Sequence, residues 1–141
     1  MAYDNTNAFA RILRGELPCI KVFEDEHTLA LMDIMPQVDG HVLVIPKEAA
    51  TTLLEQTAES AAACIRTVQR LARAAQQAMA VPGVLIVQVN GEEVGQTVPH
   101  VHFHVMPRTS NEALRPHVAE RETPERLQAF AQRIVAALAA T

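Results

Sequence analysis

Residues 100–104 read His-Val-His-Phe-His, so three of the six histidines lie within five positions. This strict alternation of imidazole and apolar side chains is typical of a β-strand, because successive residues of a strand point to opposite faces. The imidazoles then share one face at steps of roughly 6.6 Å, and the apolar residues between them enter the core. The segment therefore constrains the chain to fold around a sheet with one apolar face that enters the core and one face that carries the imidazoles.

Three interpretations of the histidine cluster are open. The imidazoles are half-buried polar groups on a sheet face, or they supply part of a metal site, which would still need a further ligand. In the third interpretation they act on phosphorus, because a neutral imidazole can attack it and form a covalent nucleotidyl intermediate. The preceding loop favours the third interpretation. Gly95 allows close backbone approach, and Gln96 and Thr97 are placed to hold phosphate oxygens together with nearby N–H groups.

The rest of the chain predicts an α+β fold in which about five short antiparallel strands carry one long packed helix. The expected strands cover residues 19–23, 28–32, 41–45, 84–89 and 100–107. A short helix is expected over 7–14, and a C-terminal helix opens at Thr123 with Pro124 at its first position. The long helix covers 57–80, and spacings of three and four residues predict its buried face. That face comprises Ala61, Ile65, Val68, Leu71 and Ala75.

Length and charge predict one domain and exclude some classes of partner. A chain of 141 residues has room for a single hydrophobic core. The 12 Lys and Arg against 16 Asp and Glu give a net charge of −4, which argues against binding to a nucleic-acid duplex. A small nucleotide needs only a few donors and is compatible with this charge.

The sequence also predicts a cytoplasmic protein without a membrane partner. The longest uncharged stretch, residues 74–91, contains too many polar and helix-breaking residues to span a bilayer. The N-terminus has no basic region followed by an apolar one, so no secretory signal is expected. Cys19 and Cys64 form no CxxC motif, which fits two reduced thiols in a cytoplasmic protein.

The sequence resembles the histidine triad (HIT) family in three places. Residues 95–108, from Gly-Gln-Thr through the alternating histidines to Pro-Arg, resemble the family's signature. Residues 9–18 resemble its opening helix and turn, and residues 32–37 with 40–47 resemble its second signature. The chain is most like the Hint-like bacterial branch. The resemblance implies a single HIT-like domain over 1–141, with core signatures in 9–108 and a C-terminal extension, 109–141, ending in a helix.

The same resemblance implies hydrolysis of a nucleoside phosphoramidate or a (di)nucleoside polyphosphate at the α-phosphate. His102 is then the nucleophile that becomes nucleotidylated, and its other ring nitrogen donates to a backbone carbonyl. His100 and His104 would contact phosphate oxygens, the leaving group or each other. His41 would support the cluster from a neighbouring strand. The presence of His104, the third histidine, favours a hydrolase over the transferase branch, which has Gln there.

The resemblance also implies a nucleotide site. Asp33 either accepts both ribose hydroxyls, as the matching acid of the family does, or forms a turn before Pro36. The family often has Asn or Gln at the position of Val89, and Asn90 is the candidate substitute. An apolar slot for a purine is expected, although plain core packing is an equal alternative for each residue. The slot residues are Phe9, Ile12, Phe23, Leu31, Ile34 and Leu43.

No cofactor is expected. Some bacterial relatives hold a structural zinc with a CxxC near the N-terminus and a His after the second signature. Asn7, Ala10 and Ala49 stand at those places, so we expect no such zinc. Two rival functions are a low-turnover purine-nucleotide-binding module and a metal-binding protein.

A homodimer is expected, because a sheet of about five strands leaves its edges open to a second copy. The alanine-rich long helix permits close approach of another helix. Its Arg66, Arg70 and Arg73 could pair across a two-fold axis with Glu55 or Glu59. The family resemblance implies the same assembly, a joined sheet of about ten strands with a nucleotide site in each subunit.

Overall fold

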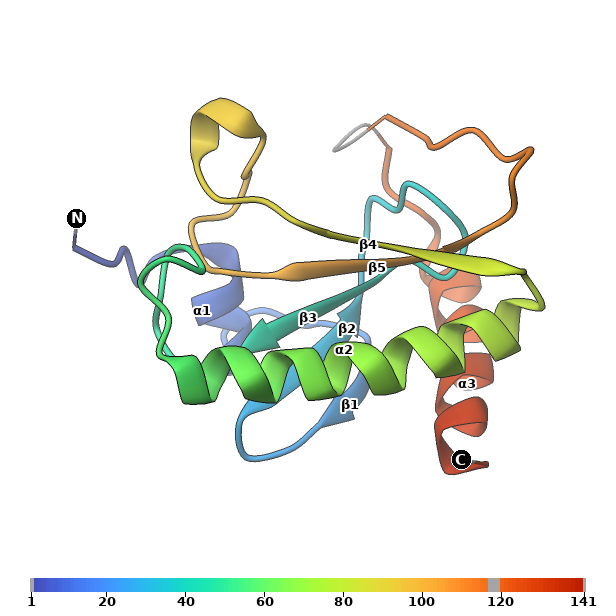
Figure 1. The fold of residues 1–141 in the computed structure, drawn as a ribbon, viewed down its shortest axis with the longest axis horizontal. Coiled ribbons are helices and arrows are strands. Elements are labelled where there is room, and N and C mark those ends of the chain that lie inside the picture. Colours follow the sequence, from blue (N-terminus) through green and yellow to red (C-terminus); the bar gives the residue numbers. More distant parts are fainter. Residues whose placement is uncertain (1, 117–119, 141) are drawn as a thin grey trace.

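The computed structural model describes residues 2–116 and 120–140, so Met1, residues 117–119 and Thr141 of the expected domain lie outside it. Its five strands form one antiparallel sheet in the order β1-β2-β3-β5-β4 (Figure 1). The strands are β1 (Lys21–Glu24), β2 (Thr28–Met32), β3 (Val42–Pro46), β4 (Gly83–Gln88) and β5 (Phe103–Arg108). The helices are α1 (Ala8–Leu13), α2 (Ala58–Met79) and α3 (Pro124–Ala139), with a 3₁₀ turn at Glu92–Val94. The predicted α+β class and the five-stranded antiparallel sheet are confirmed.

The two faces of the sheet carry different apolar clusters. On one face, side chains from α2 and α3 pack on alternating strand residues that include Val42, Val44, Phe103 and Val105. On the other face, Phe9 of α1 packs with residues that alternate with them on β2 and β3. Figure 1 shows α1 apart from the two long helices. The long helices therefore provide the main core, and the opposite face is left for the site.

Helix ends follow the capping chemistry of the sequence. The Asn7 side chain accepts the N–H of Ala10 and caps α1, and Thr57 and Thr123 cap α2 and α3 in the same way. α2 ends at Met79, one residue before the expected end, because Ala80 adopts a left-handed conformation with φ of 54°. Within the described residues, no helix is long and apolar enough to cross a membrane.

The expected buried face of α2 is partly wrong. Val68, Leu71 and Ala75 are buried as predicted, but Ala61 is only half-buried and Ile65 is 49% exposed. The buried stripe instead comprises Ala63, Cys64, Thr67, Val68, Leu71, Ala74 and Ala75. Small residues occur all round this helix, so hydropathy alone does not locate the face that packs.

Two strands begin later than expected. β1 starts at Lys21 rather than at position 19, and β5 starts at Phe103 rather than at position 100. The ladder between β3 and β5 ends with the pair Val44 and Phe103. Residues 100–102 lie before the strand, and the N–H of Val101 donates to Ala50 at 2.9 Å.

Candidate active site

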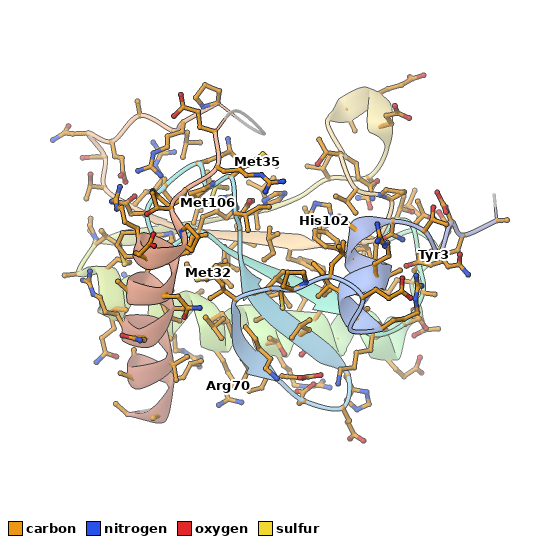
Figure 2. The ribbon with its side chains drawn as sticks, turned by 180° about the vertical axis from the view of Figure 1, so that it is seen from behind. Tyr3, Met32, Met35, Arg70, His102 and Met106 are labelled. Atoms are coloured by element: carbon orange, nitrogen blue, oxygen red, sulfur yellow. The ribbon has the colours of Figure 1, made fainter. Side chains whose placement is uncertain are left out.

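Four buried histidines gather on the sheet face opposite α2. His104 of β5 lies opposite Leu43 of β3, and the apolar residues that alternate with the histidines enter the main core, as predicted. The rings of His102 and His104 are 5.0 Å apart, and those of His41 and His104 are 5.2 Å apart. Phe9 of α1 packs edge-on against His102 at 5.0 Å between ring centres. Figure 2 shows His102 beside α1. The chain thus brings His41, predicted from a separate motif, to the three clustered histidines.

His102 holds its proton on one defined nitrogen. Its Nδ1 lies 2.8 Å from the carbonyl oxygen of His100, and a carbonyl can only accept, so Nδ1 carries the hydrogen. In a neutral ring Nε2 then keeps its lone pair. His102 also lines a largely apolar cavity, so its ring is available to a bound molecule.

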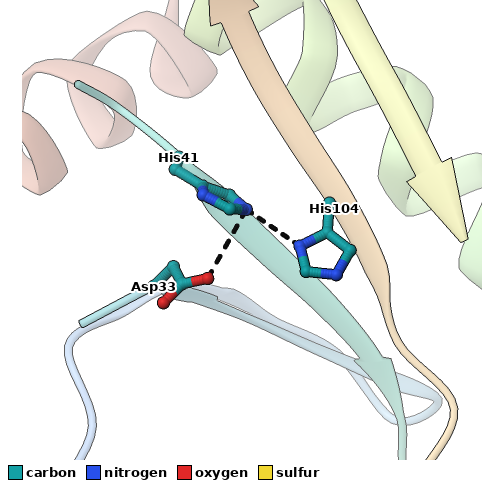
Figure 3. A group of neighbouring side chains, drawn as sticks. All are labelled: Asp33, His41 and His104. Atoms are coloured by element: carbon teal, nitrogen blue, oxygen red, sulfur yellow. Dashed lines mark hydrogen bonds and ion pairs between the residues drawn. The ribbon is translucent and has the colours of Figure 1, made fainter. Parts of the chain in front are cut away.

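A hydrogen-bonded relay fixes the proton of His104 (Figure 3). The backbone N–H of Gln37 donates to Nδ1 of His41 at 3.1 Å, so His41 carries its own proton on Nε2. That Nε2 lies 3.0 Å from Nδ1 of His104 and 3.5 Å from Oδ2 of Asp33. His104 therefore accepts at Nδ1 and carries its proton on Nε2. Two neighbouring imidazoles thus differ in chemistry: His102 has a lone pair on Nε2, and His104 has a proton there.

Asp33 also has a structural role. Its Oδ1 accepts the N–H of Met35 at 2.8 Å, which is the turn expected as the alternative to ribose binding. Its backbone N–H donates to the carbonyl of His41 at 3.0 Å, which joins the end of β2 to the residue before β3. The Asp33 side chain is 12% exposed and the residue lines the cavity, so turn formation and a ligand contact are compatible.

The group Asp33, His41 and His104 has three ligand atoms within 4.8 Å of one another, a spacing that a metal ion could use. The hydrogen bonds argue against it. A metal on Nε2 of His41 would need the lone pair there, yet Gln37 donates to Nδ1 and leaves the proton on Nε2. The hydrogen bonds therefore account for the close spacing of these three side chains without a metal.

His100 is held on both ring nitrogens. Its Nε2 donates to the carbonyl of Pro46 at 2.9 Å, and the hydroxyl of Tyr3 donates to its Nδ1 at 2.5 Å. Asn7 in turn donates to the Tyr3 hydroxyl at 2.9 Å. Burial lowers the pKa of His100 below its usual 6.5, so the ring is neutral. His100 is absent from the cavity lining and fastens the N-terminal segment to the backbone that supports His102.

The cavity has a volume of about 370 Å³ and lies between α1, the end of β2 and the histidines. Nine of the sequence-predicted residues line it: Phe9, Ile12, Leu31, Asp33, Ile34, Leu43, Thr97, His102 and His104. Phe23 does not, because it packs on the helix face beneath the guanidinium of Arg70, 4.7 Å from the ring centre. Of the two alternatives left open for Phe23, the structure shows core packing and not a place in the slot. The lining also includes Arg121 of the C-terminal extension, which no local pattern in the sequence indicated.

The loop before β5 is shaped by its own polar residues. Gln96 accepts the N–H of Gly91 at 2.8 Å and donates to the carbonyls of Thr51 and Val98. Gly95 has φ of 111°, a conformation that side-chain-bearing residues rarely adopt. Neither Gln96 nor Gly95 lines the cavity.

Asn90 is tied to the neighbouring loop instead of the cavity. Its Oδ1 accepts the N–H of Leu53 at 2.7 Å, and its amide donates to Gln88. The three positions that correspond to zinc ligands in some relatives hold a helix cap, a buried alanine and an exposed alanine, at Asn7, Ala10 and Ala49. Their side chains offer no thiolate or imidazole to a metal.

Comparisons with known proteins identify relatives of this chain. The HIT domain family model matches residues 14–111. A 13.2 kDa HIT-like protein of Azospirillum brasilense is 49% identical over 107 residues, 73% of this chain and 86% of that protein. An adenosine 5′-monophosphoramidase of Schizosaccharomyces pombe is 38% identical, over 74% of this chain and 75% of that protein.

Comparison with solved structures finds relatives of the same family. A crystal structure of a Hit-like protein from Bartonella henselae superposes with a TM-score of 0.92 at 41% identity, covering 97% of this chain and 99% of that one. A match over most of the chain, joined to three clustered imidazoles in the expected order, identifies the family. The chain belongs to the HIT family of proteins.

Proposed function

We propose that the protein hydrolyses nucleoside phosphoramidates or (di)nucleoside polyphosphates at the α-phosphorus through a nucleotidyl-His102 intermediate. The observation that carries this proposal is the bond from Nδ1 of His102 to the His100 carbonyl, which leaves a nucleophilic lone pair on Nε2 beside the cavity. The similarity to an adenosine 5′-monophosphoramidase supports the same class of reaction.

The proposed first step forms a bond from Nε2 of His102 to the α-phosphorus and breaks the bond to the leaving group. His104, with its proton on Nε2, donates a hydrogen bond toward a phosphate oxygen or the leaving atom as negative charge develops there. His41 and Asp33 keep that proton on the correct side of the His104 ring. In the second step water attacks the phosphorus, releases the nucleoside monophosphate and returns the electron pair to His102.

The nucleoside would bind along the apolar wall. Phe9 and Ile12 of α1 face Leu31 and Leu43 of the sheet across the cavity, and such walls suit a planar base. Asp33 stands at the edge of that wall with a carboxylate oxygen able to accept from ribose hydroxyls. No resident cofactor is part of this proposal.

The decisive experiment is intact-mass spectrometry after incubation with a guanosine or adenosine phosphoramidate. Wild type is expected to show a nucleotidyl adduct, and His102→Asn is expected to show none. The variant should lose several orders of magnitude of rate, well over ~4 kcal/mol of barrier lowering. His27→Asn is the matched control, because His27 is exposed and remote from the cavity. Nucleotide binding by wild type without an adduct or turnover would favour the binding-module function instead.

We also propose that the protein acts in the cytoplasm as a homodimer of single-domain chains. β4 lies at an edge of the sheet, and its Ile86 is 47% exposed. Pairing of β4 with its copy would join two sheets and cover this side chain.

A further inference from the structure

The segment between β5 and α3 is fastened to the turn that carries Asp33. The backbone N–H of Arg115 donates to the carbonyl of Gln37 at 2.8 Å, and that of Glu122 donates to the carbonyl of Ile34 at 2.8 Å. Arg115 and Glu122 both follow the 14–111 match to the family model, so both attachment points belong to the C-terminal extension. The extension thus forms part of the wall beside the candidate nucleotide site.

Two arginines of this region, Arg115 and Arg126, are held in ion pairs. Asp39 accepts from Arg115 at 2.5 Å and from Arg126 at 3.1 Å, and Arg126 also pairs with Glu122 at 3.2 Å. Arg121 is exposed and makes no hydrogen bond or ion pair with another described residue. It lines the cavity, and no other arginine or lysine of the described chain does so. Its five donors are available to a bound molecule.

The position of Arg121 along the cavity follows from its neighbour. Glu122 is bonded to Ile34, so Arg121 enters the cavity on the side of Ile34 and Met35. His102 lies on the side of α1, where it contacts Phe9, and Figure 2 shows Met35 and His102 apart. With phosphorus at His102 and the sugar at Asp33, a base that lies along the apolar wall would extend toward Ile34 and Arg121, which line the same cavity.

We infer that Arg121 contacts the edge of the base and favours 6-oxopurines, such as guanine and hypoxanthine, over adenine. This inference rests on the proposed nucleotide site. Two parallel N–H groups of a guanidinium match the O6 and N7 acceptors of a 6-oxopurine. Adenine places an amino donor where O6 would be, so one guanidinium N–H then faces another donor. Arg121 is a specificity-determining residue.

The size of the effect follows from known bidentate contacts. A good arginine–guanine pair discriminates against the wrong base by roughly 5- to 150-fold. Because Arg121 is exposed to solvent, we expect the lower part of that range, about tenfold.

The test measures binding of GMP, IMP, AMP and 7-deaza-GMP by calorimetry to the full chain. Wild type is expected to bind GMP and IMP about tenfold more tightly than AMP, and 7-deaza-GMP, which lacks the N7 acceptor, more weakly than GMP. Arg121→Gln is expected to remove the difference between GMP and AMP. Arg73→Gln removes the same charge from an exposed position on α2 and is expected to leave the affinities for all four nucleotides unchanged.

Each outcome decides the inference. Equal affinity of wild type for GMP and AMP, tighter binding of AMP, or equal weakening of all four nucleotides by Arg121→Gln would overturn it. If Arg121→Gln loses selectivity while wild type forms no adduct with a phosphoramidate, the base contact stands and the proposed reaction fails. If turnover occurs without base selectivity, the reaction stands and the base contact fails. Absence of binding by any nucleotide overturns both.

Discussion

The buried imidazoles are distinguished by the groups that contact their Nδ1 atoms. A backbone carbonyl accepts from Nδ1 of His102, whereas His41 donates to Nδ1 of His104. The same ring therefore presents a lone pair on Nε2 in one position and a proton on Nε2 in the next. This difference is set by hydrogen-bond partners and requires no difference in charge between the two side chains.

We predict that Asp33→Asn weakens ribonucleotide binding more than 2′-deoxyribonucleotide binding. A charged acceptor to a hydroxyl contributes roughly 1.5–3 kcal/mol, and the deoxy ligand has already lost part of that contact. Calorimetry with GMP and 2′-deoxy-GMP measures the difference. Asp25→Asn is a matched control, since Asp25 forms a similar turn with His27 and Thr28 outside the cavity. Equal weakening of both ligands would assign Asp33 to the relay and the turn alone.

His100 makes folding sensitive to pH. Burial lowers its pKa in the folded chain below 6.5, so the unfolded chain binds a proton at higher pH than the folded chain does. Its contribution to the free energy of unfolding is present above pH 6.5 and is lost as pH falls through the lowered folded pKa.

Urea unfolding on both sides of pH 6.5 measures this effect. The decrease in stability on acidification should be smaller in His100→Gln than in wild type. His27→Gln, which changes an exposed histidine, should keep the wild-type dependence. An unchanged dependence in His100→Gln would contradict the prediction.

At the scale of elements, alternation and caps were the reliable sequence signals. The strand 28–32 and the cap at Thr123 were predicted correctly, because each depends on residues adjacent in the chain. The face of α2 was not, because alanines surround the helix and Ile65 is exposed. Hydropathy cannot rank faces built from equally small side chains.

Prediction of the site from the sequence was limited in the same way, to features that local motifs encode. The sequence predicted the histidines, Asp33 and the apolar wall from local motifs, and the cavity contains most of them. It did not predict the contact between Tyr3 and His100, because 97 residues separate the two in the chain. It did not predict Arg121 in the cavity lining, because Arg121 lies outside every signature. The proton positions likewise depend on Gln37, whose backbone direction no side-chain pattern encodes.

We predict that α3 is an integral part of the core. Ile134 is fully buried, and the adjacent Val135 is 44% exposed. Ile134→Ala should lower the free energy of unfolding by about 2–5 kcal/mol, whereas Val135→Ala should change it by about 0.5 kcal/mol or less. Chemical denaturation of the two variants measures the difference. Equal small losses would show that the helix packs loosely in solution.

For the whole molecule, the two edges of the sheet differ. The β1 edge carries Lys21 and Glu24, which pair with each other, and Lys47 also pairs with Glu24. Charges of this kind discourage pairing with another strand. The sequence of β4, Gly-Val-Leu-Ile-Val-Gln, has no charge, so this edge is the better candidate for self-association.

We predict that wild type sediments as one species near twice 15.4 kDa at low micromolar concentration. Ile86→Lys should shift the protein toward the monomer, because it places a charge at the joined edge. Val135→Lys alters an exposed apolar residue on α3 and should leave the assembly intact. A wild-type species near 15.4 kDa would contradict the dimer.

The alternation around β5 has a consequence for how such a chain can change over generations. Inserting or deleting one residue in 101–105 would turn imidazoles into the core and apolar side chains into the cavity together. Loss of stability and loss of chemistry would then arise from the same event. We therefore expect tolerated length variation to be absent from this stretch, whereas the turn at 91–95, with no buried residue in its 3₁₀ helix, can accommodate it.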